Sequence, residues 1–257
     1  MLILGGVLLL LAPRPAAAKE LEALRTQLGA ADLEQAQEAA KELGASTDPK
    51  ALDTILNALS VGAPPAVQGA LLDALEGKKD ARAIGVVSHY ARNRNPELRK
   101  KAIVVVGALP PGDARAVPIL LTGLSDETPE VRAAAAEALG RRREHTAVNP
   151  LLELLERGDA SAAPALAQLA TPELARRISD QLGRVPDAQL CAVLGAMLER
   201  PDFGPDPVRV EVVRTLSKVP GADSTAALVE YLASSEKDKL RPSRTAAQKI
   251  VDQRSSQ

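Results

Sequence analysis

Residues 126–140 read Asp-Glu-Thr-Pro-Glu-Val-Arg-Ala-Ala-Ala-Ala-Glu-Ala-Leu-Gly, and parts of this stretch recur along the chain. Pro96 and Arg99 stand 33 residues before Pro129 and Arg132. A second recurring feature is an aspartate ahead of an Ala-rich apolar run, at Asp48, Asp80 and Asp113, spaced 32 and 33 residues apart. A fixed period of this length indicates stacked helix–turn–helix units, each of which buries its apolar face on its neighbours.

The composition fits such a stack. Only 1% of the 257 residues are aromatic and none is Trp, so Ala, Leu and Val must fill the core. These small and medium side chains suit thin layers of closely packed helices. The formal net charge of −1 provides no global field that would attract nucleic acid or a membrane surface. We therefore expect an all-α protein whose partners do not include nucleic acid.

The predicted architecture is an α-solenoid, an α-α superhelix of about six stacked antiparallel helix pairs. Clear repeats are expected over residues 31–158 and irregular repeats over 159–204. A resumed repeat and a C-terminal cap are expected over 205–257. We predict that residues 19–257 form one such domain, which begins after an N-terminal leader.

The Pro-Glu-Val-Arg and Ala-rich parts of 126–140, followed by Leu151-Leu152 and Leu154-Leu155, resemble the HEAT-like repeat. More narrowly, they are similar to the short Ala-rich class first associated with phycobilin lyases. The resemblance covers about residues 30–250 and implies an armadillo-like helical fold. Most members of the family are interaction scaffolds, and a minority are enzymes or chromophore-handling subunits. The resemblance also implies that the repeated arginine ties adjacent units together, which predicts a stacking role for Arg99, Arg132 and Arg209.

The N-terminal 18 residues have the pattern of a secretory signal peptide. An apolar run at Leu2–Ala12 is followed by Ala16–Ala18, a small-residue cleavage site. The run is shorter than the roughly 20 residues needed to span a bilayer, so we expect no stable membrane insertion after signal removal. We expect an exported protein, periplasmic or extracellular. Because no Lys or Arg precedes the run, a cytoplasmic protein with an apolar tail remains the alternative.

No residue pattern points to catalysis, a metal or a cofactor. The two histidines, His89 and His145, are 56 residues apart and are expected at the surface. Cys191 lies on an apolar helix face and is expected to be a buried small hydrophobe. HEAT-like iron hydroxylases carry His-Glu pairs, and HEAT-like DNA glycosylases need aromatic side chains. This chain has no His-Glu dipeptide and almost no aromatic residues, so the sequence predicts no enzyme of either kind.

The favoured function is a non-catalytic scaffold that binds a protein partner through a concave surface lined by the second helix of each repeat. Charge is uneven along the chain: residues 19–76 carry −6 (four basic, ten acidic) and residues 77–115 carry +6 (nine basic, three acidic). A partner with an acidic segment would fit the positive part. The candidate contact residues are Arg82, His89, Arg92, Arg115, Thr122, Asn149 and Glu153. A lyase-like or chromophore-handling subunit and an extracytoplasmic assembly factor are the alternatives.

The leader yields the first prediction. In its native host the mature protein should begin at or near Lys19, because signal peptidase cleaves after a small-residue site. Intact-mass and N-terminal peptide mass spectrometry of the native protein will measure this. Recovery of mature protein that still carries Leu2–Ala12 would contradict the prediction.

Overall fold

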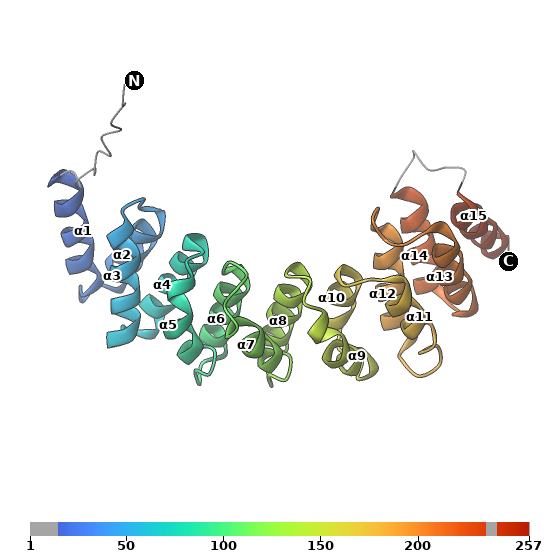
Figure 1. Cartoon of the computed structure of the whole chain (residues 1–257), viewed down its shortest axis with the longest axis horizontal. Helices are drawn as coiled ribbons and strands as arrows, with labels where there is room; N and C mark the ends of the chain where they lie inside the picture. Colours follow the sequence, from blue (N-terminus) through green and yellow to red (C-terminus); the bar gives the residue numbers. More distant parts are fainter. Residues whose placement is uncertain (1–14, 235–240, 257) are drawn as a thin grey trace, which may run out of the picture. The chain divides into compact units, whose positions relative to one another are not determined.

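A computed structural model of the chain describes residues 15–234 and 241–256. Within these ranges the chain forms fifteen α-helices, two short 3-10 helices and no β-strand, which confirms the all-α prediction. The predicted apolar run Leu2–Ala12 lies outside the described residues. The elements in chain order (Figure 1) are α1 (Pro15–Leu28), α2 (Leu33–Ala45), α3 (Pro49–Val61), α4 (Pro65–Lys78), η1 (Ala81–Ala83), α5 (Ile84–Tyr90), α6 (Pro96–Ala108), α7 (Ala116–Gly123), α8 (Pro129–Arg141), η2 (His145–Ala147), α9 (Val148–Glu156), α10 (Ala162–Gln168), α11 (Pro172–Ser179), α12 (Asp187–Glu199), α13 (Asp206–Lys218), α14 (Ala222–Ala233) and α15 (Pro242–Ser255).

The contacts divide the chain into two compact units, Met1–Pro110 and Pro111–Gln257. In the first unit, α2 packs on α4 and α4 packs on α6. In the second unit, α8 packs on α10, α10 on α12 and α12 on α14. We call these even-numbered helices the first helices, and α3, α5, α7, α9, α11, α13 and α15 the second helices. Each unit is thus a stack of helix pairs, as the α-solenoid prediction requires.

The repeated aspartates mark the starts of second helices. A carboxylate oxygen of Asp48 accepts a hydrogen bond from the backbone N–H of Lys50 at 2.8 Å. Asp80 and Asp113 make the same contact with the amide two residues later, each at 2.9 Å. A helix leaves its first amides without partners, and an acidic side chain at the cap satisfies one of them. Asp48 caps α3, Asp80 caps η1 just before α5, and Asp113 binds the turn just before α7. The period seen in the sequence is therefore a period of aspartates that bind backbone amides at or just before the start of a second helix.

The first helices approach one another very closely because glycine and alanine lie between them. A Cβ added to Gly44 would lie 2.9 Å from the Cβ of Ala74, and one added to Gly195 would lie 3.0 Å from the Cβ of Ala227. The second helices α3 and α5 contact each other far less than the first helices α2 and α4 do. The more closely spaced row of a curved stack lies on its inner side. This packing therefore favours the first helices as the inner row of each unit, whereas the sequence analysis assigned that place to the second helices.

Residues 206–209 read Asp-Pro-Val-Arg and resemble Pro-Glu-Val-Arg at 129–132. This motif begins α13, which is a second helix, whereas at Pro96 and Pro129 it begins first helices. Three helices, α10, α11 and α12, stand between α9 and α13. First and second helices alternate along the chain, so an odd number of helices after the second helix α9 moves the motif from the row of first helices to the row of second helices. The irregular stretch predicted over 159–204 is the place where this change occurs.

A core leucine provides the second prediction. Leu139 on α8 is completely buried, and α8 packs against both α7 and α10. Leu139→Ala should lower the free energy of unfolding of the second unit by about 2–5 kcal/mol, because it removes buried methyl groups and leaves a cavity. Leu33→Ala is the matched control, since Leu33 is 47% exposed, and it should change stability by about 0.5 kcal/mol or less. Urea unfolding followed by far-UV circular dichroism measures both, and a loss below about 1 kcal/mol for Leu139→Ala would show that the site tolerates truncation.

Candidate functional site

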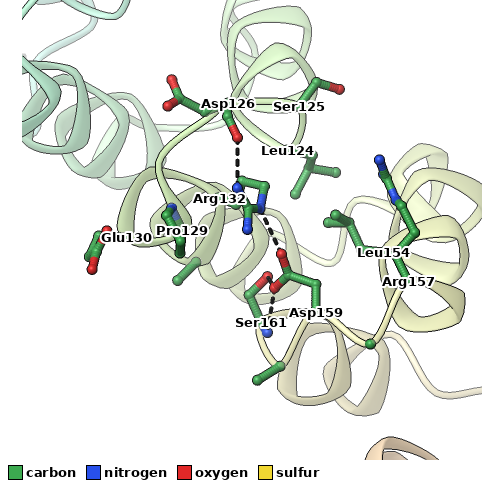
Figure 2. Close-up of a pocket in the computed structure, with 13 residues that line it drawn as sticks. Leu124, Ser125, Asp126, Pro129, Glu130, Arg132, Leu154, Arg157, Asp159 and Ser161 are labelled. Atoms are coloured by element: carbon green, nitrogen blue, oxygen red, sulfur yellow. Dashed lines mark hydrogen bonds and ion pairs between the residues drawn. The ribbon is translucent and has the colours of Figure 1, made fainter. Parts of the chain in front are cut away.

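A cavity in the second unit lies where one repeat meets the next. It has a volume of about 890 Å³ and is open to solvent. Figure 2 shows Arg132 of α8 between the loop that holds Asp126 and the loop that holds Asp159. Its Nη1 donates to the carbonyl oxygens of Asp126 at 2.9 Å and Glu127 at 3.1 Å. Its Nε donates to Oδ2 of Asp159 at 2.6 Å.

Both partners of this ion pair are largely withdrawn from solvent, with 21% of the Arg132 side chain and 14% of the Asp159 side chain exposed. Burial acts to raise the pKa of Asp159, but hydrogen bonds from Ser161 and Arg132 outweigh it and lower that pKa. The carboxylate is therefore held ionised by groups of its own chain. Because the cavity's central charges satisfy each other, we interpret it as a joint between repeats.

Similar arginine contacts recur elsewhere in the chain. Nη1 of Arg99 donates to the carbonyl oxygens of Asn93 at 3.0 Å and Arg94 at 3.2 Å. Arg209 is 2% exposed and donates to the carbonyl oxygens of Leu198 at 2.7 Å and Arg200 at 2.6 Å. Each guanidinium reaches back to carbonyl oxygens that precede its own helix. Arg132 has the predicted stacking role, because its ion pair with Asp159 reaches the next repeat. The bonds of Arg209 given above join α12 to α13 within one helix pair.

In the first unit, the predicted contact residues Arg82, His89 and Arg92 are all exposed. Arg82 is not electrostatically free. Its Nη1 lies 2.8 Å from Oδ1 of Asp53, and its Nε lies 3.2 Å from Oδ1 of Asp80. The hydrogen bond between Arg82 and Asp80 raises the pKa of the arginine and lowers that of the aspartate. Two carboxylates therefore offset the charge of this arginine.

His89 lies at a cavity of about 380 Å³ in the first unit. Three helices and the loop after α5 contribute its lining: Leu59, Ser60, Gln68, Gly85, Val86, His89, Tyr90 and Asn93. The hydroxyl of Tyr90 donates to the carbonyl oxygen of Leu59 at 2.8 Å and joins α5 to the end of α3. Val61, at the end of the same helix α3, is 79% exposed. We call this cavity the α3–α5 pocket.

In the second unit, the predicted residues Arg115, Thr122, Asn149 and Glu153 are likewise exposed. Nη2 of Arg115 lies 2.6 Å from Oδ2 of Asp113, and hydrogen bonds from Arg115 lower the pKa of that carboxyl to about 2. The hydroxyl of Thr122 donates within its own helix, to the carbonyl oxygen of Pro118 at 2.9 Å.

Oδ1 of Asn149 accepts a hydrogen bond from Arg177 at 2.9 Å, which links α9 to α11. Val117 and Val148, on the same helices as Thr122 and Asn149, are half-buried. Within the second unit the predicted residues therefore lie on the second helices, and most make contacts within the chain.

The sequence analysis identified His89 but not the other polar residues of the α3–α5 pocket. Ser60 comes from α3 of the preceding helix pair, Gln68 from α4, and Asn93 from the loop after α5. The contact residues were predicted from the second helices alone, so residues of other helix pairs, first helices and loops were not included.

The residues with possible reactivity are placed as expected. His89 and His145 are both exposed, and Cys191 is buried. Burial raises the pKa of the Cys191 thiol to about 11, so the thiol is protonated at neutral pH. Over the part of the chain that the structure describes, no group of three or more His, Cys, Asp or Glu side chains is arranged to hold a metal ion. In the same part, no helix is both long enough and apolar enough to cross a membrane.

Comparison with solved structures shows the fold. The chain is similar to a chain of the complex of CpcE and CpcF of phycocyanin lyase from Nostoc sp. PCC7120, with 18% identity and a TM-score of 0.50, covering 91% of this chain and 94% of that one. It is also similar to Kap121p in the structure bound to Pho4p, with 15% identity and a TM-score of 0.53, covering 93% of this chain and 30% of that one. Kap121p alone matches with 16% identity, a TM-score of 0.53 and coverage of 92% and 29%.

No curated protein matches the sequence of the chain. This chain spans about a third of the length of Kap121p and nearly the full length of the lyase chain. At these identities the likeness concerns the fold. Residues 89–170 match the family model described as HEAT repeats, a stretch that includes α6, α8 and the arginine joints at Arg99 and Arg132. Residues 89–170 therefore carry HEAT repeats, and the chain has the α-solenoid fold.

Proposed function

We propose that this protein is a non-catalytic scaffold that binds a protein partner through the exposed side of its second helices. The observation that carries the proposal is the α3–α5 pocket, which is lined by a predicted contact residue, His89, and by apolar residues such as Leu59 and Val86. A cavity with apolar and polar lining is typical of a site that receives a side chain of a partner. Arg115, Thr122, Asn149 and Glu153 form a second proposed contact area, on the second unit.

The partner segment that fits the first unit best is acidic. Arg82 is already paired with Asp53 and Asp80, so it adds little positive potential. Arg92 and Arg94 differ from it, because neither guanidinium has a hydrogen bond or ion pair to another described residue. Both lie in the loop that follows α5. An acidic segment would gain two charge pairs there without displacing any internal one.

The proposed location is outside the cytoplasm, and it rests on the secretory pattern of the N-terminal 18 residues. An extracytoplasmic assembly factor is one form that such a scaffold would take. The lyase-like or chromophore-handling alternative rests on the likeness to the phycocyanin lyase chain, which is one of fold at 18% identity. No cluster of side chains in the described residues favours it over partner binding.

The third prediction tests the acidic partner. The purified protein is applied to an array of short peptides in which one position at a time is fixed and the others are randomised. It should select Asp and Glu at several positions. Arg92→Glu should weaken binding of the selected peptides by about tenfold at low salt, and the difference should shrink at high salt because the charges are exposed. Fluorescence anisotropy of labelled peptides measures both effects.

Arg25→Glu is the matched control. Arg25 lies on α1 of the same unit, is exposed and has no partner among the described residues, so the change in net charge is identical. It should leave peptide binding nearly unchanged. Equal weakening by both variants would show a diffuse charge effect instead of a site, and an array without acidic selection would reject the proposed partner.

A further inference from the structure

We propose that the α3–α5 pocket receives one uncharged side chain of the acidic partner segment, together with its adjoining peptide group. This inference rests on the proposed function, because it specifies how the acidic segment is anchored. The recognised pattern would be a neutral residue with acidic residues beside it. The argument uses the lining of the pocket, the free hydrogen-bonding groups in it and the two charges that adjoin a lining residue along the chain.

The interior of the pocket does not suit a charged group. Of the described residues that line it, none is Asp, Glu, Lys or Arg. A carboxylate placed inside would lose its hydration without facing a permanent cation, which is costly. The side chain of Val86 and the open surface over Gly85 offer apolar contact instead. An uncharged side chain is therefore the group that the interior favours.

Two amide side chains in the lining have complementary unused groups. Nε2 of Gln68 donates to the carbonyl oxygen of Ala63 at 2.6 Å, which leaves the side-chain oxygen of Gln68 as an acceptor. Oδ1 of Asn93 accepts from the backbone N–H of Asn95 at 2.9 Å, which leaves its Nδ2 as a donor. A peptide group carries one donor and one acceptor. Gln68 and Asn93 together therefore offer what one peptide group of a bound segment needs.

Two positive charges adjoin a lining residue of the pocket along the chain. Asn93 lines it, and Arg92 and Arg94 flank Asn93 in the same loop. Neither arginine has a side-chain partner among the described residues. Acidic residues on either side of the anchored residue would pair with them, while the neutral residue enters the pocket. This arrangement distinguishes a segment with a neutral anchor from an uninterrupted acidic run.

Gly85 makes the pocket testable without disturbing the fold. It is an exposed residue of α5, and a Cβ added to it would meet no other atom within 4 Å. Gly85→Leu would therefore place an apolar side chain at the pocket from a Cβ position that is open, and replacing a helical glycine with leucine favours the helix. Gly77 on α4 is equally exposed and open and does not line the pocket, so Gly77→Leu is the matched control.

The fourth prediction compares two peptides that differ at one position: one has a neutral residue between acidic residues, and the other is acidic throughout. The wild-type protein and Gly77→Leu should bind the peptide with the neutral anchor more tightly. Gly85→Leu should lose about tenfold in affinity for that peptide and bind the two peptides equally. Anisotropy titrations measure the affinities, and circular dichroism verifies that each variant is folded.

Asn93→Asp is the second variant. It keeps the oxygen that accepts from Asn95 but removes the Nδ2 donor, so it should also weaken binding of the anchored peptide. Unchanged binding by both Gly85→Leu and Asn93→Asp, or a wild-type preference for the uninterrupted acidic peptide, would overturn the pocket assignment alone. If the wild-type protein binds neither peptide, the proposed acidic partner fails as well, so the two failures are distinguishable.

Discussion

The hydrogen bonding of carbonyl oxygens between successive helices is the constraint on which this structure depends. The last carbonyl groups of a helix lack partners within it, and closely packed helices leave little room for water to supply them. Arg209 and Arg244 donate to such oxygens of the preceding helix. Arg99 and Arg132 donate to carbonyl oxygens of the loop before their own helix. Arginine suits this role because its guanidinium has five N–H donors in a fixed plane and stays charged when buried.

The burial of these arginines is compensated in several ways. Arg132 gains a carboxylate partner in Asp159. The guanidinium of Arg209 lies 5.4 Å from the centre of the Phe203 ring, and that of Arg244 lies 5.5 Å from the centre of the Tyr231 ring. An aromatic face stabilises a cation that has lost its water. Phe203 and Tyr231 are among only three aromatic residues in the chain, so two of the three serve these joints.

Much of the fold was predictable because it follows from local chemistry that repeats. Asp48, Asp80 and Asp113 indicate helix starts, because aspartate prefers to bind the backbone amides found there. Leu139, in the Ala-rich motif, is buried. The row in which a helix lies was not predictable in the same way. Row membership depends on how many helices precede it, and the motif at Asp206 looks the same in either row. The close approach at Gly44, which decides which row is more tightly packed, depends on contacts between repeats.

The candidate site was predictable only in part. Helical periodicity predicts that the seven candidate contact residues are exposed. It does not predict which of their charges are offset by other side chains of the chain. The aspartate that caps a second helix lies two residues before Arg82 and likewise before Arg115, and in both places it pairs with that arginine. The polar lining of the α3–α5 pocket comes from residues about 30 positions apart, at Ser60 and Asn93, and no local pattern connects them.

The buried Cys191 makes the chain useful for chemical labelling. It is the only cysteine in the sequence, it is 2% exposed, and its pKa of about 11 keeps it as the unreactive thiol. A maleimide reagent would reach this thiol only when α12 separates from its neighbours α10 and α14. The rate of modification is thus an intrinsic reporter of local opening in the second unit. A cysteine introduced on the surface would label selectively, without removal of the native one.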